Sequence, residues 1–255
     1  MATHLAKALH GVGYTISQIW SRSFDHAEQL AYEVSAHPID KLERLNTTDS
    51  YYILAINDDA LFEVAPQLSL RDAVVVHTSG SVPMSVLRTI SRHHGVLYAP
   101  QTFVRTQQMD YAQLPFCIEG ATPQALKEIE LLARSISEKV FPVDSDQRVW
   151  LHMASVMMNN FGNALHAMGQ DLMREHNLPF EILQPLIELT TKKALSEYAS
   201  TDSLWRLQTG PAVRGDEKTI YKHLLMLKDN ETLFHLYELM TKAIEENCPP
   251  TTQKK

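Results

Sequence analysis

The chain is poor in the features that mark disulfide-rich, secreted, membrane and nucleic-acid-binding proteins. Its 255 residues include only two cysteines, Cys117 and Cys248, so no disulfide framework is possible and we expect a reduced, cytoplasmic protein. No apolar run approaches the roughly 18 residues of a membrane span. The start lacks the basic and apolar regions of a signal peptide. The net charge is -7 without a basic face, which argues against nucleic acid or an anionic membrane as the main partner.

The order of apolar runs divides the chain into two parts. Strand-like runs alternate with helical ones up to residue 143, and only helical runs follow. The sequence therefore predicts an α/β domain with a Rossmann-like parallel sheet over residues 1–143, an all-α domain over 144–248 and a polar tail over 249–255. The twelve histidines show no ligand spacing, so we predict no metal site.

Two buried strands around residues 51–80 open onto polar residues. Tyr51–Ile56 and Ala73–Val76 read as parallel strands with a helix, Ala60–Leu70, between them. Ligands of open α/β sheets bind at the carboxyl ends of the strands. We therefore expect a binding rim formed by the residues that follow the two runs, which are Asn57, Asp58, His77, Thr78, Ser79 and Gly80. For Thr78 and Ser79 the alternative role is capping of a helix that starts near Pro83, and His77 is equally a turn histidine or a substrate contact.

Further strands are expected at 95–98, 116–119 and 139–143, with a helix over 123–137 between the last two. The first of these strands ends before Pro100, and Gln101 follows as a polar group on the same rim. Gln101 is therefore a candidate for contact with the substrate.

The first residues read as the second half of a βαβ nucleotide-binding unit. A helix over Met1–His10 ends at Gly11 and Gly13, and a strand over Tyr14–Trp20 follows. The leading strand and its glycine-rich turn are not encoded. We expect the chain to be incomplete as given, with an apolar run and a Gly-x-Gly-Asn-like turn encoded upstream.

A second unusual stretch runs from Gln208 to Asp216. Thr209, Gly210 and Pro211 predict a tight turn and Gly215 a second break, with Arg214 held between them. Arginine binds a carboxylate bidentately, so this turn is a candidate for substrate recognition. A local ion pair of Arg214 with Asp216 or Glu217 is the alternative.

These motifs resemble the Rossmann-fold NADP oxidoreductases related to pyrroline-5-carboxylate reductase and 6-phosphogluconate dehydrogenase, and most closely a bacterial family of unknown function with a helical C-terminal domain. The resemblance implies that residues 2–9, with Thr3, follow the phosphate-binding turn, and that Asn57 and Asp58 lie where the family contacts the cofactor. His-Thr-Ser-Gly at 77–80 and the stretch 208–216 match its most specific motifs. The relatives' catalytic lysine has no counterpart, because no lysine lies between Lys139 and Lys192.

The residues Ser21, Arg22 and Ser23 predict the cofactor. A carboxylate at this strand end would bind a ribose 2'-hydroxyl, whereas Arg22 between two serines suits a 2'-phosphate and therefore favours NADP over NAD. The alternative is that Arg22 is a solvated residue that opens the helix Asp25–Ser35.

A long helix over Asp146–His176 carries a polar strip on an otherwise apolar surface. At 100° per residue, His152, Asn159 and Asn163 fall within about 40° of one another and Asn160 flanks them. The strip either hydrogen-bonds across helices or faces the nicotinamide, with His152 as proton donor and the asparagines orienting the substrate. Such a helix is about 45 Å long, so we also expect it to pack against a second subunit in a homodimer.

The motifs together predict a two-domain NADP-dependent oxidoreductase. It would transfer a hydride to or from a small carbonyl or imine substrate bound between the two domains. The alternative is an NADP-binding sensor or scaffold without catalysis, which the missing lysine and glycine turn would favour.

Overall fold

The computed structural model describes residues 1–105 and 107–248, so the expected polar tail at 249–255 lies outside the described residues. The chain packs as two compact units, residues 1–166 and 167–255, and each is described by itself. The boundary expected at residue 143 falls just after the last strand. The assignment of residues 144–248 to one helical substrate and dimerisation domain stays a prediction.

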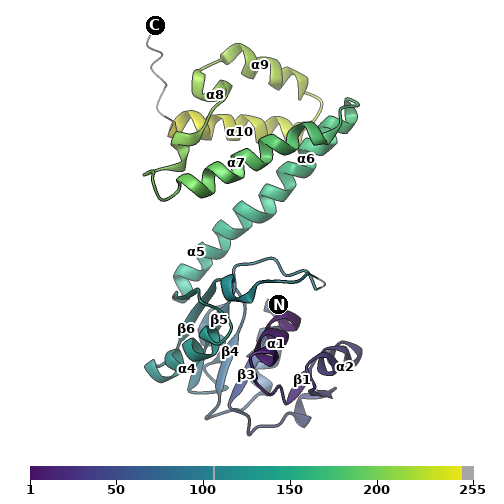
Figure 1. Ribbon diagram of the computed structural model, residues 1–255, viewed down its shortest axis with the longest axis vertical. Coiled ribbons are helices and arrows are strands. Elements are labelled where there is room, and N and C mark those ends of the chain that lie inside the picture. Colours follow the sequence, from purple (N-terminus) through teal and green to yellow (C-terminus); the bar gives the residue numbers. More distant parts are fainter. Residues whose placement is uncertain (106, 249–255) are drawn as a thin grey trace. The chain divides into compact units, whose positions relative to one another are not determined.

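A five-stranded sheet forms the centre of the first unit (Figure 1). Its order is β3-β4-β5-β6-β7, with bounds Tyr51–Leu54, Val74–His77, His93–Tyr98, Phe116–Gly120 and Val140–Pro142. Neighbouring strands are parallel except β5 and β6, which are antiparallel. The expected parallel sheet is therefore present with one antiparallel pair.

Helices cover both faces of this sheet, which explains why its strands are apolar without alternation. Val74 and Val76 of β4 pack with the helices α1 (Ala2–Gly11) and α4 (Pro123–Arg134). Val75, between them, packs on the opposite side with α3 (Asp58–Val64).

A separate pair of parallel strands, β1 (Gln18–Trp20) and β2 (His37–Ile39), lies beside this sheet and is connected by α2 (Phe24–Glu33). β1 is shorter than the predicted strand Tyr14–Trp20. The sequence analysis missed β2, since it has three residues and Pro38, which lacks an N–H, lies in the middle. In the part of the chain that the structure describes, no backbone hydrogen bond joins β1 to β3.

Two predicted helices are shorter than expected. The helix over Ala60–Leu70 ends as α3 at Val64 and continues as a 3₁₀ turn over Ala65–Gln67, because Pro66 cannot donate the next helical hydrogen bond. The helix expected from Pro83 is a 3₁₀ turn, Met84–Leu87.

The long helix is present but not uniform. α5 (Ser145–Ser155) begins with a capping box formed by Asp144 and Gln147. α6 runs from Gly162 to Glu175. A π-helical segment, Val156–Phe161, lies between them. The constant 100° per residue assumed for the polar strip is therefore wrong across this segment.

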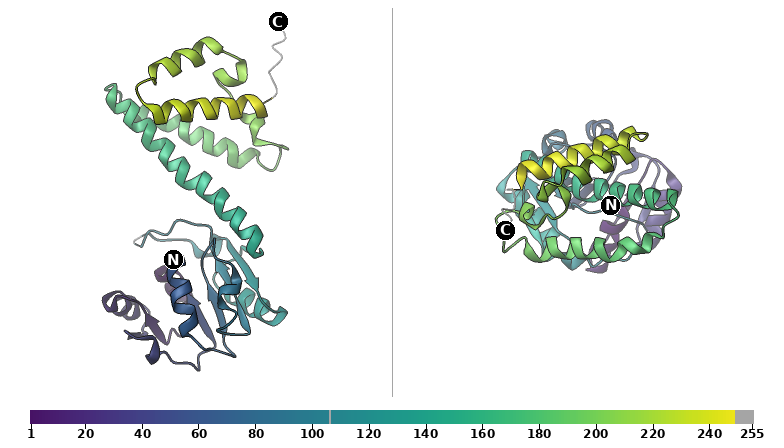
Figure 2. Two further views of the ribbon diagram at one scale, coloured as in Figure 1. Left: turned by 180° about the vertical axis from the view of Figure 1, so that it is seen from behind. Right: turned by 90° about the horizontal axis from the view of Figure 1, so that it is seen from above.

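The second unit contains the end of α6 and four further helices. These are α7 (Gln184–Glu197), α8 (Pro211–Arg214), α9 (Glu217–Met226) and α10 (Glu231–Asn247), and Figure 2 shows them from two sides. Asp216 and Asn230 cap α9 and α10 by accepting hydrogen bonds from backbone N–H groups. None of the helices in the described part of the chain combines the length and the apolar character needed to cross a membrane.

Candidate functional site

The predicted cofactor residues gather at the carboxyl ends of strands in the first unit. Ser21 and Arg22 follow β1, Asn57 precedes α3 after β3, and residues 77–80 end β4 and the turn after it. A hydrogen bond from the Ser81 hydroxyl to the Asp58 carboxylate joins the loops after β3 and β4. The strand ends therefore form a polar rim, as expected for a parallel sheet.

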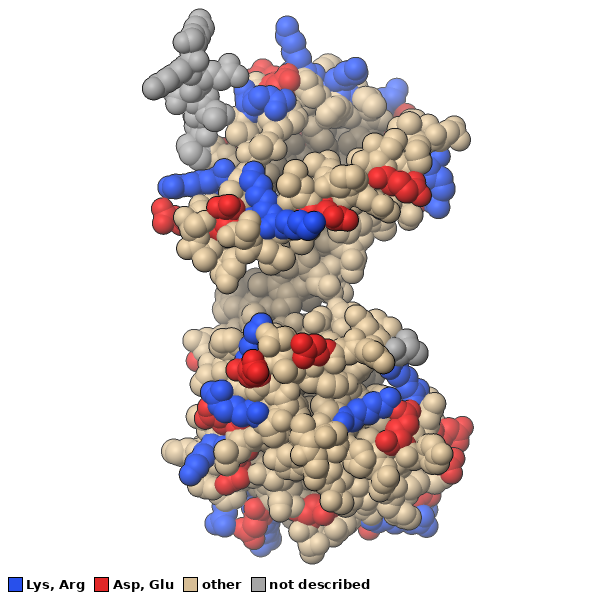
Figure 3. All heavy atoms as spheres, viewed as in Figure 1, with Lys and Arg blue, Asp and Glu red and all other residues tan. Residues whose placement is uncertain are grey.

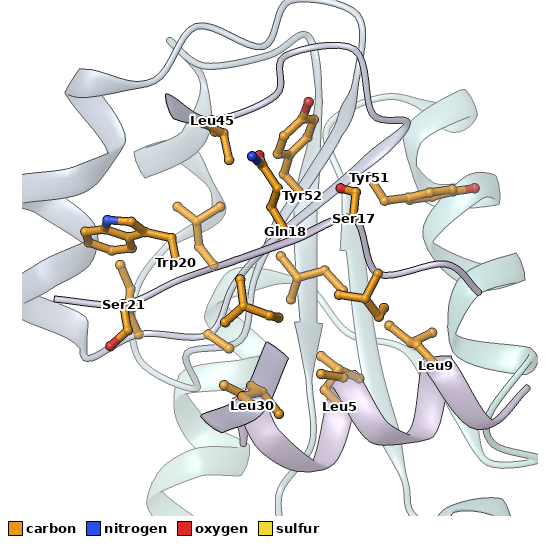
Figure 4. Close-up of a pocket in the computed structure, with 18 of the residues that line it drawn as sticks. Leu5, Leu9, Ser17, Gln18, Trp20, Ser21, Leu30, Leu45, Tyr51 and Tyr52 are labelled. Carbon is orange, nitrogen blue, oxygen red and sulfur yellow. The ribbon is translucent and has the colours of Figure 1, made fainter. Parts of the chain in front are cut away.

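A cavity of about 830 Å³ opens between β1, β3 and α1 (Figure 4). Four of the predicted cofactor residues line it, namely Thr3, Ser21, Arg22 and Asn57. Ser23, Asp58 and residues 77–80 are not among its lining residues. The larger part of the cavity wall is apolar and includes Leu5 and Leu9, which point into it from α1.

Arg22 is free to receive an anion. Its side chain is exposed, and no carboxylate forms an ion pair with it among the described residues. The Ser21 hydroxyl accepts a hydrogen bond from the Ser23 N–H at 3.3 Å, which fixes the loop that carries the guanidinium. The donor set of one arginine and two hydroxyl groups fits a phosphate.

The turn after β4 is built by its own side chains. His77 is fully buried, and its Nδ1 accepts a hydrogen bond from the Ser79 N–H at 3.2 Å. The Ser79 hydroxyl accepts from the N–H groups of Ser81 at 3.1 Å and Val82 at 3.0 Å. These contacts favour the turn role for His77 and Ser79, and leave half-buried Thr78 as the hydroxyl available for a ligand.

The pKa of His77 is lowered to about 4. Burial is the larger cause, and the positive charge of the nearby Arg148 guanidinium is the second. The imidazole is therefore neutral at physiological pH. A neutral, buried histidine supports the shape of the turn, and because its Nδ1 accepts a hydrogen bond, its remaining N–H is on Nε2.

The sequence analysis missed the buried arginine of α5. Arg148 is fully buried, and its Nη1 lies 2.6 Å from Oε2 of Glu119 on β6. Its Nη2 donates to the Val82 carbonyl at 2.5 Å. Arg148 thereby joins α5, β6 and the turn after β4. A single arginine in an amphipathic helix gives no sequence signal that distinguishes a buried from an exposed side chain.

His152 lies against this turn together with Tyr98, which was also missed. The Tyr98 hydroxyl and the His152 Nδ1 are 3.2 Å apart. A Cβ atom on Gly80 would lie 2.6 Å from the same Nδ1, so the absence of a side chain at Gly80 permits this approach. Burial raises the pKa of Tyr98, so its hydroxyl keeps its proton. The position of Tyr98 at the end of β5 is the signal that could have identified it.

The predicted polar strip does not assemble as one set. The Asn159 side chain donates to the Thr102 hydroxyl at 2.8 Å, whereas His152 contacts Tyr98 and Gly80. Asn160 and Asn163 are exposed. The Gln101 side chain accepts from the Thr102 N–H at 2.9 Å, so the loop after β5 and Asn159 lie together at the rim.

The stretch 208–216 belongs to the second unit and has the predicted turns. Gly210 and Gly215 have φ angles of 104° and 64°, which favour glycine. Arg214 is exposed, and no ion pair with Asp216 or Glu217 occurs among the described residues. The pKa of Asp216 is lowered mainly by hydrogen bonds from the Thr219 hydroxyl and N–H, and to a smaller extent by the charges of Arg214 and Lys218. The alternative of a local ion pair is therefore not observed, and roles for Arg214, Thr209 and Gly210 in substrate binding stay predictions.

Residues 114–244 match the family described as a domain of unknown function, DUF2520. The structure also matches that of a candidate NADP oxidoreductase from Bacteroides fragilis, with 36% sequence identity over 96% of this chain and 94% of that chain and a TM-score of 0.84. The chain belongs to the DUF2520 family. The resemblance found in the sequence, to a Rossmann-fold family of unknown function with a helical C-terminal part, is confirmed.

More distant structures share the fold of this DUF2520 protein. A protein from Thermotoga maritima is 22% identical over 96% of this chain and 95% of that chain, with a TM-score of 0.74. An imine reductase from Myxococcus stipitatus in complex with NADP+ is 14% identical over 96% and 90% of the two chains, with a TM-score of 0.66. No curated protein matches the sequence.

Proposed function

We propose that this protein is an NADP-dependent oxidoreductase that transfers a hydride between the cofactor and a small imine or carbonyl substrate. The observation that carries the proposal is the rim of the first unit, where an unpaired arginine and a tyrosine–histidine pair lie near strand ends. The family relationship to the Bacteroides fragilis protein supports the oxidoreductase class, and the fold shared with an imine reductase favours an imine substrate.

Arg22 is proposed to bind the 2'-phosphate of NADP. Ser21 and Ser23 flank it, and Thr3 and Asn57 line the same cavity. Asp58, Thr78 and Gly80 complete the proposed cofactor rim. His77 and Ser79 stabilise the turn after β4 by accepting hydrogen bonds from its backbone N–H groups. NADPH bound at this rim would supply the hydride.

The proton for the reduced nitrogen or oxygen is proposed to come from His152. The protonated Tyr98 hydroxyl is within hydrogen-bond distance of Nδ1, and donation to that atom would leave the Nε2–H for the substrate. Tyr98 is thus a positioning residue. Asn159, with Asn160, Asn163 and Gln101, is proposed to orient the substrate, and Asn159 is already fixed by Thr102.

Arg214 is proposed to recognise a carboxylate of the substrate. Its exposed guanidinium is held between two glycine turns, and Thr209 and Gly210 form the first of these turns. Among the described residues no carboxylate forms an ion pair with Arg214, although Asp216 interacts with it electrostatically, and a guanidinium can bind a planar carboxylate bidentately. The substrate class is therefore a small imine or keto acid.

A homodimer through the helical unit is also proposed. Large apolar side chains of these helices are more than half exposed, including Ile182, Leu186, Leu189, Leu195, Tyr198, Tyr221 and Leu239. Exposed apolar side chains in this number favour contact with another protein chain. Figure 3 shows acidic and basic side chains interspersed over the face in view, without a large area of one sign.

The test of the proposed chemistry is oxidation of NADPH with a panel of cyclic imines and keto acids, followed by absorbance. His152→Gln should lower kcat by about 100-fold, the usual contribution of a general acid, and Tyr98→Phe should also lower kcat because the hydroxyl that positions His152 is lost. Both variants should leave NADPH binding unchanged. Tyr32→Phe, at a side chain that is 89% exposed, is the control. Tight NADPH binding without turnover on any substrate would instead favour the non-catalytic sensor.

A further inference from the structure

The cavity of the first unit carries its acidic and basic side chains at opposite ends. Among the described residues that line it, the Asp, Glu, Lys and Arg residues are Asp49, Arg22 and Arg105. Asp49 accepts a hydrogen bond from the Ser17 hydroxyl, and these two residues precede β3 and β1. Arg22 follows β1, and Arg105 lies in the loop after β5. Both arginines therefore come from the carboxyl ends of parallel strands, the end at which a ligand is expected.

The loop after β5 is attached to the first turn of α1 by a buried histidine. His4 is 4% exposed, and its Nε2 lies 2.9 Å from the Val104 carbonyl oxygen. Its Nδ1 lies 3.1 Å from the Tyr111 hydroxyl, and its ring centroid lies 5.3 Å from that of Phe103. A carbonyl oxygen accepts, so Nε2 is the donor in the first contact. Val104 and Tyr111, which lie on either side of Arg105 in the chain, thus contact the same side chain of α1.

The Arg105 side chain reaches from this loop to α2. Its Nη2 donates to the Gln29 side-chain oxygen at 2.6 Å. One helical turn further along, the side chains of Lys7 on α1 and Glu33 on α2 form an ion pair that joins the two helices. The Arg105 guanidinium therefore lies level with Thr3, in the first turn of α1, and Thr3 lines the same cavity.

This guanidinium has donors left for an anion. Gln29 is a neutral partner and takes up one of the five N–H donors of an arginine. None of the ion pairs found in residues 1–105 and 107–248 involves Arg105. Arg105 is also exposed, so a ligand at the rim can reach its side chain.

An NADP molecule brings two kinds of phosphate group to a Rossmann-like sheet. The 2'-phosphate lies at the end of the strand that follows the first helix, whereas the diphosphate lies at the start of that helix. Arg22, directly after β1, is at the place for the 2'-phosphate. Arg105, level with the first turn of α1, is at the place for the diphosphate.

We propose that Arg105 is a cofactor-binding residue that pairs with the diphosphate of the nicotinamide cofactor. The proposal rests on the cofactor class proposed above and assigns to Arg105 a role that differs from that of Arg22. The planar fork of N–H donors suits two phosphate oxygens. Because NADPH and NADH share the diphosphate, Arg105 contributes affinity for both cofactors, and Arg22 contributes the preference between them.

The test is isothermal titration of the full chain with NADPH and with NADH. Arg105→Ala should weaken the binding of both cofactors by about tenfold or more, because charge-assisted hydrogen bonds are lost, and should leave the ratio of the two dissociation constants unchanged. Arg22→Ala should weaken the binding of NADPH alone. Arg88→Ala, which deletes an exposed arginine outside the cavity, is the control and should change neither affinity. Circular dichroism spectra that match that of the wild-type protein exclude unfolding as the cause of weaker binding.

Two results would overturn this assignment while the proposed function stands. Unchanged affinities of Arg105→Ala for both cofactors would show that the guanidinium does not contact the cofactor. Weaker binding of NADPH alone would assign Arg105 to the 2'-phosphate instead of the diphosphate. A wild-type protein that binds neither cofactor would overturn the proposed function and this inference together, and that result is seen before any variant is compared.

Discussion

The two units of the chain bury their apolar side chains to very different extents. The first unit has apolar clusters on both faces of its sheet, with Val75, Leu87, Leu97 and Ile129 almost inaccessible to solvent. Within residues 167–248, no apolar side chain other than that of Cys248 is buried. A sheet with helices on both faces buries its apolar side chains within the same unit, whereas the helices of the second unit leave apolar side chains exposed. This exposed apolar surface is the physical basis of the proposed dimer.

The largest expected effect is on the stability of the first unit. Arg148→Met should lower the free energy of unfolding by about 3–5 kcal/mol, because Glu119 is left as a largely buried, unpaired charge. Urea denaturation followed by circular dichroism measures the loss. Arg134→Ala, which breaks an exposed pair with Glu130, is the control and should cost about 0.5 kcal/mol or less. Equal effects of the two variants would show that the Arg148 contacts are not energetically important.

The next effect is a pH dependence that arises in the same unit. The pKa of His77 is depressed from 6.5 to about 4 in the folded protein, so the unfolded chain binds the extra proton. Neutral His77 therefore contributes its full share to the free energy of unfolding above pH 6.5. This contribution, up to about 3 kcal/mol, is lost as the pH falls toward 4. The denaturation midpoint should depend less on pH across this range in His77→Asn than in the wild-type protein. In the control His37→Asn, which changes an exposed histidine, the dependence on pH should stay as steep as in the wild-type protein. An unchanged slope in His77→Asn would contradict the assignment.

In the second unit, replacing an exposed apolar side chain by a charged one should weaken the dimer rather than lower the stability of the fold. Leu189→Glu places a charge on an exposed apolar side chain of α7 and should weaken the dimer by about 2 kcal/mol, as expected for an interface contact. Sedimentation equilibrium measures the dissociation constant. Thr191→Glu adds the same charge without removing an apolar side chain. A wild-type protein that is monomeric at all concentrations would remove the proposed dimer.

A change at the rim should affect turnover with only a smaller effect on stability. Gly80→Ala forces the His152 ring away from Tyr98 and should lower turnover at least about tenfold while costing about 1–2 kcal/mol of stability. Gly11→Ala adds the same methyl group at a position where nothing lies within 4 Å apart from its chain neighbours and the backbone of its own helix, and it should leave turnover unchanged. Full activity of Gly80→Ala would show that the Tyr98–His152 contact is not used.

Much of the first unit could be predicted because its signals are local. The apolar runs at β3 and β4 and their polar ends identify buried parallel strands and a rim. β2 escaped prediction because three residues with a proline carry no periodicity. The π-helical segment also escaped, and with it the true directions of Asn159 and Asn163, because no residue pattern in Val156–Phe161 distinguishes π from α.

The candidate site was predicted less completely for a different reason. Asn57, Arg22 and His152 could be named from their positions at strand ends or on a helix face. The contacts of Arg148 with Glu119 and of Tyr98 with His152 join residues more than 25 positions apart, so they depend on the tertiary structure. Sequence periodicity reports which face a residue occupies and not which residue it meets.

The most direct test of the proposed function is the cofactor preference of Arg22. Isothermal titration should give NADPH an affinity at least about tenfold higher than NADH, since only NADPH carries the 2'-phosphate that Arg22 can bind. Arg22→Ala should remove this preference, whereas Arg88→Ala, which deletes an exposed arginine that does not line the cavity, should preserve it. Equal affinities of the wild-type protein for NADPH and NADH, or a preference that survives in Arg22→Ala, would contradict the account.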